Sequence, residues 1–213
     1  MADIICHGTP SPELFQMHLA YVGRQRKSAV VAYEHRPKSQ GWGHFERFAL
    51  KNGKTEQGTP LANTWRDLFY DNRMLRPSCY RCPHTLLKRE SDITIADFWG
   101  IENSSRPEVK DALGVSLVLA NSERGERVVS ELQQHGLIEV WPMTVAEALP
   151  GNPMLERPST YEGDHGEPWR ALYRDGYARM VREMGYRRSG ASDLVRCAVS
   201  KAKRVAKRML ERR

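Results

Sequence analysis

Hydrophobic and polar positions in the first third of the chain predict a strand, a helix and a hairpin. An apolar run, Ile4-Ile5-Cys6, leads through the turn-rich sequence HGTPSP. A helix is expected from Ser11-Pro12-Glu13, because Pro fits the first helical turn and Ser can cap it. Strands are expected over residues 29–33 and 45–50, with a hairpin turn at Asn52-Gly53.

The remaining pattern alternates helices and strands. Apolar residues at helical spacing from Leu61 predict a helix that ends at Arg76-Pro77. Alternating residues in SDITIADFWG predict a strand that ends in Asp97-Phe98-Trp99-Gly100, and an apolar run predicts a buried strand over 115–120. A helix is expected between 121 and Gly136, with Val128, Val129 and Leu132 facing inward. A further strand is expected over 137–141, and helix again over 169–186. The predicted fold class is α/β (or α+β), a mixed β-sheet flanked by helices, plus a basic C-terminal helix.

Charge separates the C-terminus from the rest of the chain. Residues 187–213 hold ten Lys or Arg and two acids, and residues 1–186 hold 23 basic and 24 acidic residues. We therefore expect a domain over 1–160, a helical extension over 161–186 and a basic amphipathic tail helix over 187–213. The tail fits an anionic membrane surface, an acidic partner or a solvated helix, and gives no specific nucleic-acid signal.

The start of the chain and the length of its apolar runs indicate the expected cellular location of the protein. No run approaches the roughly 18 apolar residues of a membrane span, and the first residues lack a secretory signal pattern. The expected location is cytoplasmic, with a peripheral position at the inner membrane face as the alternative. The sequence contains no GxGxxG, GxxxxGK[ST] or GxSxG motif, so nothing predicts a Rossmann site, a P-loop or a nucleophile elbow.

Three of the four cysteines are candidate metal ligands. Cys79 and Cys82 are two residues apart, a spacing that directs two thiolates at one centre, and Pro83 follows as at many iron–sulfur sites. The spacing also fits zinc or a dithiol, although a redox dithiol normally begins a helix after a strand. Cys6, at the end of the first strand, is by itself more typical of a small buried hydrophobic residue. Cys197 lies in the basic tail and is expected to be structural.

The strand that follows the cysteine pair carries acids and aromatics. It lies in SDITIADFWG, so Asp92 precedes it and Asp97 and Trp99 stand at its end. Such residues at a strand end suit a wall against a flavin or another planar ring. A core strand with an aromatic plug is the plainer interpretation of the same pattern.

Four stretches together resemble one known family: IICHGTPSPELF, GWGHFERFALKNGK, LRPSCYRCPHTLLKRESDITIADFWGIE and GVSLVLANSERGERV. Over residues 3–160 they are similar to the C-terminal domain of the coenzyme F-420 hydrogenase/dehydrogenase beta-subunit family, in the bacterial form found beside polysaccharide-synthesis genes. The resemblance implies an iron–sulfur flavoprotein with a 4Fe-4S cluster and FAD. It assigns Cys6, Cys79 and Cys82 to the cluster, and we assign Asp92, Asp97 and Trp99 to the cofactor wall.

The resemblance also implies partners and a departure from the family pattern. Electrons would pass between cluster, FAD and coenzyme F-420 or a redox protein such as ferredoxin. Ser11 stands where the family's Gly-Thr-Pro turn has a cysteine, and the cysteine-rich ferredoxin-like segment is expected to be absent or on a separate chain. A fourth ligand would then come from His7, His84, Cys197 or another polypeptide. The alternative function is a non-catalytic accessory protein of a surface-polysaccharide pathway.

Overall fold

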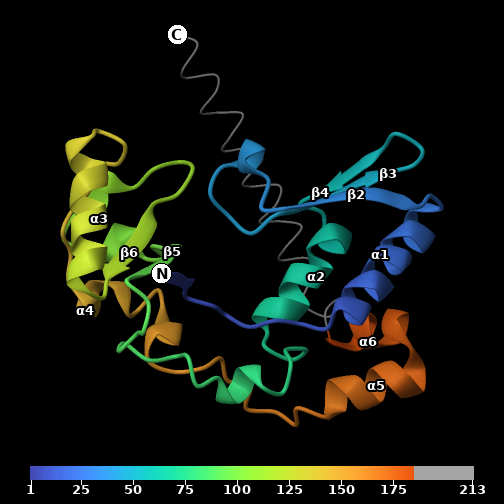
Figure 1. The fold of residues 1–213 in the computed structure, drawn as a ribbon. Helices are drawn as coiled ribbons and strands as arrows, with labels where there is room; N and C mark the ends of the chain where they lie inside the picture. The colour runs from blue at the N-terminus through green and yellow to red at the C-terminus, as the bar shows by residue number, and fades with distance from the viewer. Residues whose placement is uncertain (185–213) are drawn as a thin grey trace. The chain divides into compact units, whose positions relative to one another are not determined.

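The computed structural model describes residues 1–184, which form two compact units (Figure 1). The first unit consists of Met1–Ser11, Arg36–His44 and Leu75–Glu162. The second unit consists of Pro12–His35, Phe45–Met74 and the described residues from Gly163 onward. Each unit is therefore assembled from three separate stretches of sequence.

Along the described chain, helices separate two runs of consecutive strands, and the last four α-helices follow one another. The strands are β1 (Ala2–Ile4), β2 (Val30–His35), β3 (Glu46–Leu50), β4 (Thr55–Gln57), β5 (Ile93–Asp97) and β6 (Ser116–Ala120). The α-helices are α1 (Pro12–Arg26), α2 (Pro60–Tyr70), α3 (Glu123–Gln134), α4 (Val145–Ala148), α5 (Glu167–Asp175) and α6 (Tyr177–Met184). Short 3-10 turns lie at η1 (Lys38–Gln40), η2 (Cys79–Arg81), η3 (Ile101–Asn103), η4 (Pro107–Val109) and η5 (Pro153–Leu155).

The first unit is built on a mixed sheet of order β1-β5-β6. β1 pairs with β5 in parallel, whereas β5 pairs with β6 antiparallel. Because successive side chains of a strand point to opposite faces, Thr94 and Leu117 lie on the buried face. The core of this unit comprises Phe98, Ile101, Leu117, Ala148 and Leu155.

The other face of this sheet carries an exposed apolar row. Ile4 lies opposite Ile95, and Ile95 lies opposite Val118. Their exposed fractions are 66%, 42% and 44%, respectively. The sheet is therefore buried on one face only.

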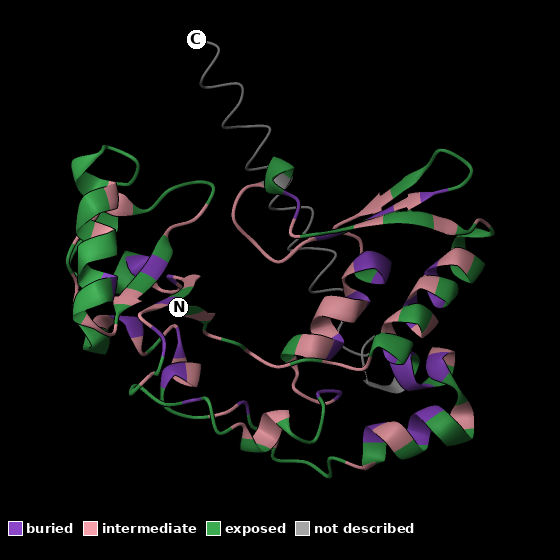
Figure 2. Cartoon of the chain, in the orientation of Figure 1, coloured by how far each residue is buried: buried purple, intermediate pink, exposed green. Residues whose placement is uncertain are grey.

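Helix α3 packs on this sheet through its first turn. Ser122 caps the helix, because its hydroxyl accepts a hydrogen bond from the Gly125 amide at 3.2 Å. Gly125 is buried against the backbone of Asp92, so closely that a Cβ there would lie 2.0 Å from the Asp92 carbonyl oxygen. Most of the helix is exposed (Figure 2), including Val128, which we expected to face inward. The inward prediction is therefore wrong for Val128, because the helix is anchored by glycine rather than by an apolar stripe.

Two other local predictions need correction. Residues 137–141 form no strand: Leu137 is exposed, and its amide caps α3 by donating to the Leu132 carbonyl at 2.9 Å. Helix α2 ends at Tyr70 rather than near Arg76-Pro77, because Asn72 has a φ of 59°, in the left-handed region that ends helices. The spacing of hydrophobic residues alone predicts neither the absence of this strand nor the early end of α2.

The second unit packs helices on a three-stranded antiparallel sheet of order β2-β3-β4. The expected Asn52-Gly53 turn joins β3 to β4, and Gly53 has the positive φ, 81°, that such a turn favours. Thr59 caps α2 by accepting a hydrogen bond from the Ala62 amide at 3.1 Å. The core of this unit comprises Leu14, Tyr21, Val22, Phe48, Leu50, Leu61, Ala62, Leu68, Met74, Ala171, Leu172, Tyr177, Met180 and Val181.

The predicted fold class is confirmed, with two small sheets and flanking helices. The helix expected over 169–186 is two helices, because the backbone turns at Gly176, whose φ is 77°. The basic tail helix over 187–213 lies outside the described residues, and the boundaries near 160 and 186 stay predictions. Among residues 1–184, no helix has the length and apolar character needed to cross a membrane.

Candidate functional site

The parallel strands of the first unit end at the same edge of their sheet. Cys6 follows β1 and Asp97 ends β5, and the pairing continues beyond Ile4, since the Ile5 amide donates to the Ile95 carbonyl at 3.1 Å. In open α/β sheets, ligands bind outside the carboxyl ends of parallel strands. The topology therefore makes the edge that carries Asp97 and Trp99 the candidate ligand site.

The segment Arg36–His44, between β2 and β3, supplies the neighbours of Asp97 and Trp99. Arg36 Nη1 forms an ion pair with Asp97 Oδ2, and Arg36 Nε donates to the Gly43 carbonyl at 3.2 Å. The guanidinium carbon lies 5.2 Å from the centre of a Trp99 ring, within cation–π range. Both members of the ion pair are only partly exposed, so solvent screens the pair less than it would a surface pair.

Three aromatic rings gather at the same place. The ring centroids of Trp42 and Trp99 are 4.3 Å apart, with an interplanar angle of 9°. His44 stacks on Trp99 at 4.4 Å and 24°. Gly114 lies against Trp42, and a Cβ on it would approach Trp42 Cδ1 to 2.6 Å. We call Arg36, Trp42, His44, Asp97 and Trp99 the aromatic site.

The aromatic site holds two buried donors without an acceptor. Arg36 Nη2 and Trp42 Nε1 are shielded from solvent and have no hydrogen-bond partner among the described residues. A buried donor left unpaired costs about 1–3 kcal/mol, so native proteins satisfy nearly all of them. Two such donors beside stacked rings fit a planar group that carries carbonyl or other acceptor atoms.

Asp92, the third residue assigned to the cofactor wall, lies at the opposite end of β5. Its carboxylate forms an ion pair with the Met1 amine and accepts a hydrogen bond from Ser122 Oγ at 2.7 Å. These contacts, the Met1 amine first, hold the pKa of Asp92 below its ordinary value. The structure thus brings Asp97 and Trp99 together, whereas Asp92 ties the chain start to the first turn of α3.

The cysteine pair lies next to the loop that follows β1. Cys79 begins η2, and its Sγ lies 3.2 Å from the Thr9 amide, which donates to it. The Arg76 amide donates to the Thr9 carbonyl at 2.9 Å, and Pro10 bridges to Leu75.

In the described part of the chain, the three predicted ligands do not belong to a group of three metal-ligating side chains, and their assignment stays a prediction. Cys6 is exposed, Cys79 and Cys82 are partly buried, and residues 1–184 contain no group of three His, Cys, Asp or Glu side chains arranged to hold a metal ion. An iron–sulfur cluster normally needs four thiolates. The donor set in the described residues therefore does not fit a 4Fe-4S cluster, and Cys197 lies outside those residues.

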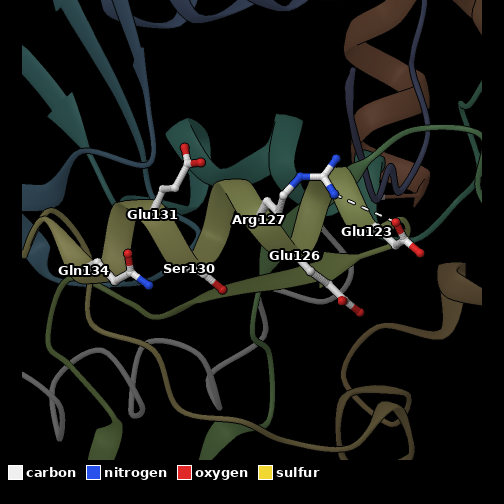
Figure 3. Close-up of a pocket in the computed structure, with 6 residues that line it drawn as sticks. All are labelled: Glu123, Glu126, Arg127, Ser130, Glu131 and Gln134. Carbon is white, nitrogen blue, oxygen red and sulfur yellow. Dashed lines mark ion pairs between the residues drawn. The ribbon is translucent and has the colours of Figure 1, made fainter.

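A shallow hollow lies over the exposed face of α3 (Figure 3). All its lining residues come from this one helix, and Arg127 forms an ion pair of 3.8 Å with Glu123 across one turn. Among residues 1–184, no second element supplies an opposing wall, so the hollow is the outer surface of a helix rather than an enclosed site. Its lining residues are Glu123, Glu126, Arg127, Ser130, Glu131 and Gln134.

Reasoning from sequence found two members of the aromatic site and missed Arg36, Trp42 and His44. The stretch GWGH carries Trp42 and His44 in a Gly-rich context, which is the one local signal that marks them. Nothing in the sequence pairs Arg36 with Asp97, 61 residues later. Only the docking of the segment Arg36–His44 into the first unit reveals the site.

Comparison with protein-family models and with curated proteins bears on the identity of the domain. No curated protein matches the chain. The family model that describes the C terminus of the coenzyme F420 hydrogenase/dehydrogenase beta subunit matches residues 1–145, which include the whole aromatic site and the cysteine pair. This match covers more than half of the chain and agrees with the family resemblance of the quoted stretches. The chain therefore belongs to this family, that of the C-terminal domain of coenzyme F420 hydrogenase/dehydrogenase beta subunits, and its domain is related to redox subunits of hydrogenases and dehydrogenases.

Proposed function

We propose that the first unit is a flavin-binding redox domain and that its aromatic site holds the flavin ring. The observation that carries the proposal is the pair of unpartnered donors, Arg36 Nη2 and Trp42 Nε1, beside the Trp42–Trp99 stack. A flavin ring is planar and carries carbonyl oxygens and ring nitrogens that accept hydrogen bonds. Family membership supports the redox class of the activity.

Each residue of the aromatic site has a role that follows from its contacts. Trp42, His44 and Trp99 offer aromatic surface against which a conjugated ring stacks. Arg36 donates from Nη2, while its Nη1 stays on Asp97, which fixes the direction of the guanidinium. When bound, a flavin supplies electron or hydride transfer, and the positive charge of Arg36 favours the more negative, reduced form of the ring.

The proposal does not include a cluster held by residues 1–184. Residues 1–184 contain no group of three metal-ligating side chains, whereas an iron–sulfur cluster normally needs four thiolates. Cys79 and Cys82 stay candidate ligands for a centre that is completed from elsewhere. Coenzyme F-420, whose deazaflavin ring is also planar and acceptor-bearing, is the second ring compound that the aromatic site suits.

Binding of ring compounds tests the proposal directly. FAD, FMN and coenzyme F-420 are each titrated into the purified full chain, with tryptophan quenching and ring absorbance as readouts. We expect Arg36→Lys to weaken binding roughly 5- to 150-fold, because Lys keeps the charge beside Asp97 and loses the planar fork that reaches a second acceptor, a loss of about 1–3 kcal/mol. Trp99→Ala should weaken binding as well, whereas Trp141→Ala, in the same unit and outside the site, should not.

Two outcomes would contradict the flavin proposal. One is the absence of binding by all three ring compounds to chain that is folded by circular dichroism. The other is binding with the same affinity in wild type, Arg36→Lys and Trp99→Ala. Circular dichroism of each variant separates a lost contact from a lost fold.

A non-catalytic accessory function is the second candidate. The ring titration separates the two candidates, because an accessory protein has no reason to retain affinity for a flavin. Iron analysis of the anaerobically purified chain adds an independent readout.

A further inference from the structure

The turn between α4 and η5, in the first unit, lies directly against the backbone of Trp99. Gly151 belongs to this turn, and a Cβ on it would overlap the carbonyl group of Trp99 and lie 2.9 Å from Trp99 Cβ. Gly100, the residue after Trp99, faces the same glycine, since a Cβ on Gly100 would lie 4.0 Å from Gly151 Cα. The absence of a side chain at 151 therefore allows the two backbones to touch.

Core residues on both sides fix the turn that carries Gly151. Ala148 before it and Leu155 after it are buried in the core of the first unit. Asn152 is also buried, and its amide donates to the carbonyls of Ala148 and Leu149, each at 3.1 Å. Because protein interiors are close-packed, the turn cannot move away from Trp99 without disturbing these residues.

The backbone of Trp99 is anchored to the same core. Phe98 before it and Ile101 after it are buried there, and the Phe98 amide donates to the Val115 carbonyl at 2.8 Å. Trp99 itself is only partly buried, and its ring stacks on that of Trp42. Two anchored backbones thus meet at Gly151, and the ring that depends on one of them belongs to the aromatic site.

We propose that Gly151 is a positioning residue of the aromatic site, because its missing Cβ lets the Trp99 backbone lie where the Trp99 ring can stack on Trp42. The effect on ligand binding rests on the proposed function, whereas the placement of Trp99 does not. A binding site must be held within about 0.5 Å of its productive geometry by the packing of its supporting residues. An added Cβ at 151 overlaps the Trp99 carbonyl group, so Trp99 would have to move farther than that.

This support of the aromatic site comes from residues that follow the family match. The match ends at residue 145, and Gly151 lies in the later stretch PGNPMLERPST. A stretch rich in Pro and Gly is typical of a loop, and its sequence does not indicate what it contacts. The structure places its glycine against Trp99, so the functional unit extends beyond the matched residues.

Gly151→Ala tests the inference, with Gly125→Ala as the matched control. Both substitutions add one methyl group against a backbone carbonyl of the first unit, but Gly125 lies against Asp92, at the other end of β5 from the aromatic site. The readouts are the circular-dichroism exciton couplet of the stacked tryptophans without ligand, and the affinity of the full chain for FAD, FMN and coenzyme F-420. Urea unfolding of both variants compares their losses of stability.

Gly151→Ala should lower the amplitude of the couplet and weaken ring binding roughly 2- to 12-fold, the contribution of one stacked aromatic pair. Gly125→Ala should lose stability and change neither readout. A couplet and a ring affinity equal to those of wild type in folded Gly151→Ala overturn the inference. An equal change in both variants also overturns it, because that result indicates a general loss of packing.

A second variant covers the case in which Gly151→Ala does not fold. Asn152→Ala removes the buried side chain whose Nδ2 donates to the Ala148 carbonyl at 3.4 Å, and it adds no atom against Trp99. We expect it to lower the couplet as well, and an unchanged couplet overturns the inference. A couplet that falls in Gly151→Ala, in a chain that binds none of the three ring compounds, refutes the flavin proposal alone. Ring binding that is the same in wild type and Gly151→Ala refutes only the positioning role.

Discussion

A buried histidine should make the second unit sensitive to mild acid. His18 on α1 is fully buried, its Nδ1 lies 2.9 Å from Tyr177 Oη on α6, and Phe48 and Trp65 pack their rings beside it. Burial lowers the pKa of His18 from 6.5 to about 3, because the charged imidazolium would lose its hydration. His18 Nε2 has no partner in the described residues to offset that loss.

The direction and size of the effect follow from proton linkage. Below pH 6.5 the unfolded chain binds a proton at His18 while the folded chain does not, so stability present above pH 6.5 is lost as the pH falls toward 3. At about 1.36 kcal/mol per pH unit below pH 6.5, the loss between pH 7.5 and pH 4.5 is about 2.7 kcal/mol. Such a loss is a large fraction of the stability of a domain of this size.

Urea unfolding of wild type and His18→Asn measures this loss. Asn places an amide near the position of Nδ1, so it keeps a partner for Tyr177 and does not titrate. The free energy of unfolding is determined from tryptophan fluorescence at pH 7.5 and pH 4.5, and the difference between the two proteins cancels the other titrating groups. We expect wild type to lose about 2.7 kcal/mol more than the variant, and an equal loss in both would refute the argument from burial.

Three further substitutions test the packing of the first unit. Gly125→Ala should destabilise the protein by about 1–3 kcal/mol in urea unfolding because its Cβ would meet the Asp92 carbonyl at 2.0 Å; stabilisation, which helix propensity alone predicts, would contradict the packing. Ser122→Ala should cost about 1 kcal/mol through loss of the α3 cap, seen as faster amide exchange at the start of α3 and not in α2. Gly114→Ala, at a φ of +96° and against the Trp42 ring, should reduce the near-ultraviolet circular dichroism of the stacked tryptophans, and an unchanged spectrum would show that the ring does not depend on this glycine.

Local chemistry made much of the secondary structure predictable. Helix starts at Pro12 and after Thr59, the hairpin at Asn52-Gly53 and strand β5 all depend on residues within one or two turns of each other. The strand expected at 137–141 is absent because a strand depends on a partner that can lie far away in the sequence. An apolar run becomes a strand only when another strand supplies hydrogen bonds, and the described chain supplies none there.

The candidate site was only half predictable. Asp97 and Trp99 stand out as a polar and aromatic strand end, and the cysteine spacing is visible at a glance. Whether Cys6 joins Cys79 and Cys82 is a tertiary question, and the described residues contain no three-residue group that would join them. The spacing of Cys79 and Cys82 in the sequence limits how far apart these two side chains can lie. A metal centre that also includes Cys6 requires a distant segment to fold against them.

The sequence by itself determined most of the helices and strands, the caps and turns, the separation of charge toward the C-terminus and the presence of the family motifs. Only the tertiary structure decided that β1 pairs with β5 and that the segment Arg36–His44 leaves the second unit to pack beside Trp99. The physical reason is the range of the forces. Backbone preferences act over a few residues, while the pairing of distant segments depends on which global packing repays the entropy of closing long loops.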